Sequence, residues 1–224
     1  ADCAVPLVTM GALLAAAALV VSIIGFFGIG PKLSELVVGL GQGALVRTLL
    51  LSGGVVIVIG MGVPTTAAYV LGASVIAIAL ERLGVSELSA HMFIFYFATL
   101  SALTPPVCAA VFVAASIAQT PWLPVAWQTV RFAVIKYLLP FIFVFHPELL
   151  LIGTPVETAL SLVFAVVGAV GLSAAFAGFL FTRLRGWEAT LIAAASVATL
   201  WPEPVTSLAG LLGLGALAFV NRLR

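Results

Sequence analysis

Apolar residues fill two long stretches of this chain, and each stretch is interrupted near its middle. The first has no charged residue between Arg47 and Glu81. As one straight helix it would reach about 50 Å at ~1.5 Å per residue, whereas the apolar core of a bilayer is ~30 Å thick. Glycines and a proline at positions 60–64 interrupt the helical pattern at its centre. The stretch therefore predicts two shorter helices that form a re-entrant hairpin over residues 44–80.

The second apolar stretch, residues 88–119, follows a polar turn in which Ser86 is placed to cap the next helix. His91 lies one turn into this helix and is assigned to the membrane interface rather than to a binding site. Ser-Ala-Leu-Thr-Pro-Pro at 101–106 interrupts the stretch. Consecutive prolines end a helix but fit the first turn of a new one. The pattern predicts a discontinuous helix with an unwound joint, and Thr104 as the N-cap of its second half.

Two central breaks in successive apolar stretches favour a shared functional site. Non-helical backbone at membrane depth is tolerated where it lines protein or a wet cavity, and transporters place ion and substrate sites there. The carbonyl end of the first half-helix, residues 58–60, suits a cation, and the amide end of the second, residues 65–67, suits an anion. The hydroxyls of Thr65 and Thr66 can bind Na⁺ or cap the helix. The alternative for each break alone is a packing kink in an ordinary tilted helix.

Composition places the whole chain in a membrane. Hydrophobic residues make up 63% and charged residues 8% of the chain, against ~25% charged residues in soluble domains. No basic cluster suggests nucleic-acid binding. The two cysteines, Cys3 and Cys108, are too few for a disulfide framework or a metal site. Neither central stretch holds an Asp or Glu, which argues against an intramembrane enzyme.

The distribution of spans divides the chain into four regions of an all-α polytopic membrane protein. Residues 1–43 hold a membrane span and a short interfacial amphipathic helix. Residues 44–119 hold the hairpin 44–80 and the broken helix 88–119. Residues 120–153 form an amphipathic arm and a span, and residues 154–224 add C-terminal transmembrane helices that act as scaffold. The Lys/Arg bias of the connecting loops puts both ends of the chain in the cytoplasm.

The residues at the two breaks resemble a known family. Gly-Met-Gly-Val-Pro-Thr-Thr-Ala-Ala-Tyr at 60–69 and Ser-Ala-Leu-Thr-Pro-Pro-Val at 101–107 are similar to the large membrane subunit of tripartite ATP-independent periplasmic (TRAP) transporters. They are most similar to fused permeases that work with TAXI-type binding proteins. The resemblance extends over residues 1–153, with further matches at 90–97 and 140–145, and it identifies the C-terminal half of such a subunit.

What the resemblance implies is a Na⁺-coupled secondary transporter in the bacterial inner membrane. A TAXI-type periplasmic solute-binding protein would deliver an organic acid, and the transport domain would move like an elevator. This chain would supply one inverted-repeat half, with its re-entrant hairpin and discontinuous helix. The remaining permease half and the small membrane subunit would then be partners that complete the site.

The resemblance also implies site residues at both breaks. The residues implied for Na⁺ are Gly60, Met61, Gly62, Thr66, Ser101, Ala102, Leu103 and Thr104. The residues implied for the substrate are Val63, Pro64, Thr65, Thr66, Thr104, Pro105 and Pro106. The alternative function is a non-transporting membrane scaffold or assembly subunit, which predicts continuous hydrogen bonding past Gly60 and no cavity between the two segments.

Overall fold

The fold is helical throughout the part of the chain that the structure covers. The structure is a computed structural model and describes residues 11–12, 15–16, 18–20, 22–23, 26–27 and 29–222. The predicted first span, over residues 6–27, lies largely outside the described residues. The chain divides into two compact units, Ala1–Ala126 and Trp127–Arg224. The all-α architecture that the sequence predicts is confirmed.

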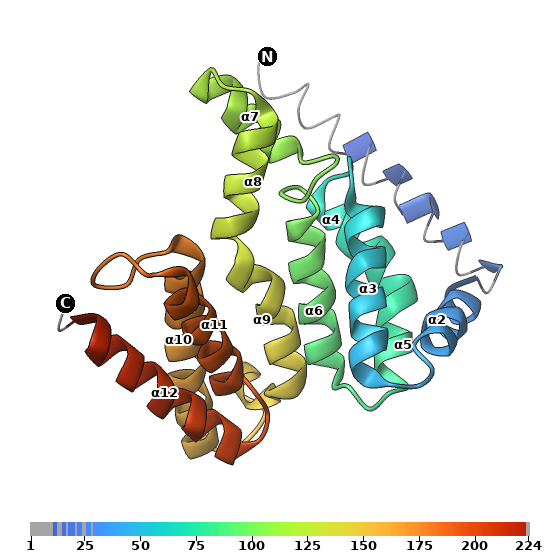
Figure 1. Cartoon of the computed structure of the whole chain (residues 1–224). Coiled ribbons are helices and arrows are strands. Elements are labelled where there is room, and N and C mark those ends of the chain that lie inside the picture. Colours follow the sequence, from blue (N-terminus) through green and yellow to red (C-terminus); the bar gives the residue numbers. More distant parts are fainter. Residues whose placement is uncertain are drawn as a thin grey trace. The chain divides into compact units, whose positions relative to one another are not determined.

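The first unit contains both the hairpin and the discontinuous helix (Figure 1). The first hairpin arm is one helix, the second arm contains a π-helical turn, and the discontinuous helix has two separate halves. The elements are α2 (Ile29–Leu40), α3 (Leu45–Gly60), α4 (Thr65–Gly72), η1 (Ala73–Ala77), α5 (Ile78–Glu81), α6 (Glu87–Leu100) and α7 (Ala109–Ala118). As predicted, Ser86 caps α6, because its hydroxyl accepts a hydrogen bond from the Ser89 amide at 3.2 Å.

Helix α6 packs closely along both arms of the hairpin because glycines face it. A Cβ added at Gly53 in α3 would lie 2.8 Å from the Phe97 ring, and one added at Gly72 in α4 would lie 2.9 Å from Ile94 Cγ2. Small residues let helix backbones approach closely where side chains would otherwise hold them apart. The core around these contacts is fully buried and apolar, and includes Leu49, Val56, Ile76, Leu80, Phe93 and Ile94.

The amphipathic helix α2 docks on the second arm of the hairpin at the π-helical turn. Ser34 of α2 is fully buried, and its hydroxyl donates a hydrogen bond of 2.5 Å to the Val75 carbonyl in η1. A π turn interrupts the regular i→i−4 ladder of an α-helix. The Ser34 hydroxyl therefore gives a carbonyl of this irregular turn a partner from another element.

The second unit is a set of long apolar helices. Helix α8 (Trp122–Phe132) begins in the first unit and leads into the second. It is followed by α9 (Val134–Phe145), the 3₁₀ turn η2 (Pro147–Leu150), α10 (Pro155–Ala177), α11 (Gly186–Thr199) and α12 (Pro204–Arg222). The segments Trp122–Phe145, Pro155–Ala177 and Val205–Arg222 are each long and apolar enough to cross a membrane.

Small residues bring α10, α11 and α12 together at close range. A Cβ added at Gly168 or Gly171 of α10 would lie 2.7 Å from Leu200 Cδ2 or 2.5 Å from Ser196 Oγ, respectively. A Cβ at Gly210 of α12 would lie 2.4 Å from the backbone nitrogen of Thr199. This spacing is typical of helices that pack inside a membrane, where van der Waals contact rather than apolar burial drives association.

A polar cluster closes the turn before α10. The His146 Nδ1 and the Ser161 hydroxyl lie 2.9 Å and 2.6 Å from Glu148 Oε1. Burial alone would raise the pKa of the Glu148 carboxyl, but hydrogen bonds from Ser161 and His146 and the charge on His146 outweigh it, so this pKa lies below its ordinary value. Glu157 also faces the turn, since its Oε2 lies 3.1 Å from a Cβ added at Gly153.

This cluster predicts an acid-sensitive contribution to stability. A carboxyl with a lowered pKa in the folded state stabilises fully above its unfolded pKa of about 4.3, and the contribution is lost as the pH falls through the lower folded value. We expect the unfolding temperature in detergent to decline below that pH, and Glu148→Gln to flatten the decline. Glu87→Gln, which removes an exposed carboxyl on α6, is the control. Parallel profiles for the wild type and Glu148→Gln would contradict the prediction.

Candidate ion and substrate site at the two helix breaks

The first break is a tight turn between the two arms of the hairpin. Helix α3 has 16 residues and spans about 24 Å, less than the ~30 Å of a bilayer core. It ends at Gly60, whose carbonyl accepts a hydrogen bond from the Val63 amide at 3.4 Å. Gly62 adopts a φ of +81°, which an L side chain disfavours. Helix α4 then begins at Thr65, so the hydrogen-bond ladder does not continue past Gly60 as the scaffold alternative requires.

The second break is longer than the sequence predicts. Helix α6 ends at Leu100, and α7 begins only at Ala109, with Cys108 at the N-cap position. The prediction that Thr104 caps the second half is therefore wrong. Its hydroxyl instead donates a hydrogen bond of 2.7 Å to the Leu100 carbonyl, which closes the end of α6. The chain re-enters a helix late because the joint folds back, and the Ala110 amide donates to the Ala102 carbonyl at 3.3 Å.

The two breaks are in direct contact. The hydroxyl of Ser101, which is 1% exposed, shares its single proton between two carbonyls: Ala98 of its own helix at 2.7 Å and Gly60 of the other break at 3.1 Å. A Cβ added at Gly60 would lie 2.4 Å from Ser101 Oγ, and one added at Gly62 would lie 3.9 Å from Val107 Cγ1. Two segments that are 41 residues apart in sequence thus meet at the positions where each helix is interrupted.

Several backbone groups at the breaks have no intramolecular partner in the described chain. Helix α4 makes its first backbone hydrogen bond through the Ala68 amide to the Pro64 carbonyl at 3.0 Å. The preceding amides of residues 65–67 donate to no described residue, and the carbonyls of Met61 and Leu103 accept from none. The carbonyls of Gly60 and Ala102, by contrast, already accept hydrogen bonds. Open carbonyls suit a cation and open amides an anion.

The predicted side chains differ in how available they are. Within the described residues, the hydroxyls of Thr65 and Thr66 make no hydrogen bond, and Thr66 is exposed. Val63 and Pro106 are also exposed, whereas Pro64 and Pro105 are half-buried. No group of three or more His, Cys, Asp or Glu side chains is placed to hold a metal ion among the described residues. Neutral oxygens are therefore the candidate ion ligands here.

One polar contact near the site is not predicted by the sequence. The Tyr69 hydroxyl in α4 lies 2.9 Å from His91 Nδ1 in α6, and both side chains are half-buried. Tyr69 follows Thr65 by about one helical turn, so this contact fixes the start of α4 against α6. Local patterns assign His91 to the membrane interface, and only the packing of the two helices brings it to Tyr69.

Interrupted helices that meet inside a helical membrane protein are typical of secondary transporters. The family model described as "Tripartite ATP-independent periplasmic transporter, DctM component" matches residues 2–158. The chain belongs to this family, which confirms the TRAP transporter membrane subunit expected from the motifs. Both breaks lie within the match, while α11 and α12 lie outside it. No curated protein and no solved structure matches the chain.

Family membership defines the general role of the chain. It is a membrane-embedded permease component of a tripartite transport system, and it works with other membrane subunits and a periplasmic binding protein. It belongs to a family of transporters rather than of enzymes.

Proposed function

We propose that this chain supplies one inverted-repeat half of a Na⁺-coupled permease that imports an organic acid. The observation that carries the proposal is the hydrogen bond between Ser101 and Gly60, which joins the two interrupted helices at their breaks. Such junctions are where secondary transporters bind their coupling ion and substrate. The family match supports the transport role independently of this geometry.

The coupling ion is held by oxygens around the end of α3 and the joint after α6. The open carbonyls of Met61 and Leu103 and the hydroxyl oxygens of Thr66 and Thr104 are the proposed ligands, together with the backbone at Gly62 and Ser101. The Gly60 and Ala102 carbonyls join them only when the hydrogen bonds that they accept give way to the ion. Na⁺ favours oxygen donors, and the carbonyl end of α3 adds a partial negative charge. With only neutral ligands, the site would bind the ion weakly enough to release it.

The carboxylate of the substrate faces the start of α4. The open amides of residues 65–67 and the hydroxyls of Thr65 and Thr66 donate to it, and Val63, Pro64, Thr104, Pro105 and Pro106 form the surrounding surface. A helix N-terminus combines open N–H groups with a partial positive charge. The Thr66 hydroxyl contacts both ligands: its oxygen binds the ion and its proton is donated to the carboxylate. Binding of either one therefore fixes the orientation of the hydroxyl that the other requires.

The remaining parts of the system follow from the same proposal. A TAXI-type periplasmic binding protein delivers the organic acid, and the other permease half and a small membrane subunit complete the site. The hairpin and α6 share a buried core, which supports movement of the first unit as one piece in an elevator mechanism. We place the chain in the bacterial inner membrane with both ends cytoplasmic, following the Lys/Arg bias.

Replacement of Thr66 by alanine tests the ion and substrate assignments. The Thr66 side chain is exposed and makes no hydrogen bond in the described chain, so its loss leaves the fold intact. We expect the Na⁺ concentration for half-maximal uptake to rise about tenfold, the equivalent of one lost ligand at ~1.4 kcal/mol. The measurement is Na⁺-dependent uptake by the complete transporter in proteoliposomes.

The matched control for Thr66→Ala is Ser116→Ala. Ser116 is also exposed, but it lies on α7 and its hydroxyl bonds only the Val113 carbonyl. We expect this variant to keep the wild-type Na⁺ dependence. If Thr66→Ala also kept the wild-type Na⁺ dependence, the assignment of Thr66 as a Na⁺ ligand would be wrong. Uptake that never depends on Na⁺, even in the wild type, would reject the coupling mechanism itself.

A further inference from the structure

Arg131 is a charged residue inside a segment that is apolar enough to cross a membrane. It lies within Trp122–Phe145, in the last turn of α8. Ionisable residues in such segments are costly, and they face protein or water-filled space where they mark functional sites. Arg131 is exposed and belongs to neither helix break, so the proposed transport site does not account for it.

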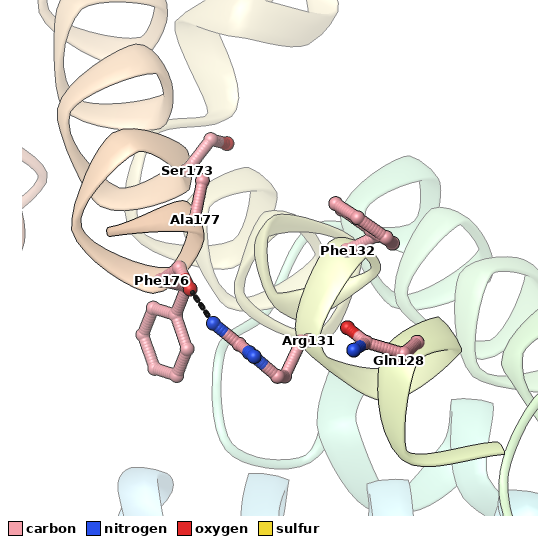
Figure 2. Close-up of a pocket in the computed structure, with 6 residues that line it drawn as sticks. All are labelled: Gln128, Arg131, Phe132, Ser173, Phe176 and Ala177. Atoms are coloured by element: carbon pink, nitrogen blue, oxygen red, sulfur yellow. Dashed lines mark hydrogen bonds between the residues drawn. The ribbon is translucent and has the colours of Figure 1, made fainter. Parts of the chain in front are cut away.

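The contact that Arg131 makes places it at the level where α10 ends. Its Nη2 donates a hydrogen bond of 2.7 Å to the Phe176 carbonyl, in the last turn of α10 (Figure 2). The last four carbonyls of a helix lack intrahelical donors, so Arg131 satisfies one of them. A connection with Arg183 and Arg185 follows α10. Positive residues that follow an apolar helix are typical of the membrane–water interface.

A small hollow with polar donors lies beside Arg131. It has a volume of about 180 Å³. The polar residues that line it are Gln128 and Arg131 of α8 and Ser173 of α10, and Phe132, Phe176 and Ala177 complete the lining (Figure 2). No carboxylate of the described residues lines it. Guanidinium, amide and hydroxyl groups can all donate hydrogen bonds to an anion.

A second hollow borders Arg131 and is mainly apolar. It has a volume of about 410 Å³ and is lined in part by Trp127, Ala175, Phe176 and Ala193. Arg131 therefore borders both a smaller hollow that holds polar donors among apolar residues and a larger one that is mainly apolar. The combination matches a phospholipid, whose anionic phosphate and apolar acyl chains are joined in one molecule, better than it matches a soluble anion.

We propose that the space between α8 and α10 binds an anionic phospholipid. The phosphate is held by Arg131, Gln128 and Ser173, and the acyl chains lie along the apolar hollow beside Trp127. Arg131 has five N–H donors, and its hydrogen bond to Phe176 uses one of them. The same residue can therefore close the end of α10 and bind a headgroup, as basic pockets between membrane helices do.

The test is lipid binding by the full chain, purified in detergent and titrated with dioleoylphosphatidylglycerol under native mass spectrometry. We expect Arg131→Ala to weaken binding about tenfold, because it removes a charged donor. Gln128→Ala, which leaves the Arg131–Phe176 hydrogen bond in place, should weaken binding about threefold. Lys136→Ala is the control, since it removes the same charge from a residue outside both hollows.

Three outcomes would overturn the proposal. Equal losses in Arg131→Ala and Lys136→Ala would show attraction to net charge rather than a site. Unchanged lipid binding in Gln128→Ala and Ser173→Ala, with a lower unfolding temperature in Arg131→Ala, would leave Arg131 as a helix cap only. Displacement of the lipid by millimolar inorganic phosphate would assign the pocket to a soluble anion.

Discussion

Replacing Gly60 by alanine will abolish substrate uptake by the complete transporter. The new methyl group would lie 2.4 Å from Ser101 Oγ and 2.6 Å from Ser101 Cβ, and the Cβ atom cannot move without its backbone. Overpacking of this kind costs about 1–3 kcal/mol, and loss of the Ser101–Gly60 hydrogen bond adds about 1 kcal/mol. Because the clash separates the two breaks, we expect transport to fall more than protein yield. Uptake in proteoliposomes and the unfolding temperature measure the two effects.

Gly54→Ala is the matched control in the same helix. A Cβ at Gly54 meets nothing within 4 Å, and the residue lies in the interior of α3. Alanine in a helix is favoured over glycine by roughly 0.5–1 kcal/mol, so this variant should be as stable as the wild type or slightly more so. Wild-type uptake by Gly60→Ala would mean that the two breaks separate without loss of function, and the shared site would have to be abandoned.

Replacing Gly210 by alanine will strongly destabilise the packing of the C-terminal helices. The added Cβ would lie 2.4 Å from the Thr199 backbone nitrogen and 2.7 Å from the Ala195 carbonyl oxygen. Backbone atoms cannot swing aside as a side chain can, so α11 and α12 must move apart. We expect a loss near the upper end of the ~1–3 kcal/mol typical of overpacking. Thermal unfolding in detergent is the measurement.

Gly215→Ala provides the comparison within α12. A Cβ at Gly215 meets nothing within 4 Å, so the substitution adds the same methyl group on an open side of the helix. We expect its unfolding temperature to match or exceed that of the wild type. Equal destabilisation by Gly210→Ala and Gly215→Ala would contradict the close packing of α11 and α12 and point to a general intolerance of alanine in α12.

The sequence predicts the helix breaks well because glycine and proline act locally. Glycines and a proline at 60–64 end α3 and start α4, and the proline pair at 105–106 keeps the second joint open. The contact between the two breaks could also be predicted. Each break leaves backbone N–H and C=O groups without partners inside the membrane, and such groups are tolerated only where protein or water surrounds them. In the structure, the two breaks contact each other through Ser101 and Gly60.

Other features depend on packing and leave no local signal. The π turn at Ala73–Ala77 has the same apolar composition as the helix around it. It accepts a hydrogen bond from Ser34 of α2, which packs against the turn but lies 41 residues away in the sequence. Thr104 closes α6 instead of starting α7 because the folded-back joint delays the next helix to Ala109.

The glycine contacts of α6 determine the geometry at the helix breaks from a distance. The hydrogen bond between Ser101 and Gly60 is 3.1 Å long, and one residue of helix rises only ~1.5 Å. A slide of α6 along the hairpin by that single rise would break the bond. The side chains of Phe97 and Ile94 prevent this slide, because each fits against a glycine of the hairpin, Gly53 and Gly72 respectively, and would collide with larger neighbouring residues if α6 moved. The packing of these side chains along α6 thus determines how the two breaks align. A larger residue at Gly53 would displace α6 and move Ser101 away from Gly60, although it contacts neither residue.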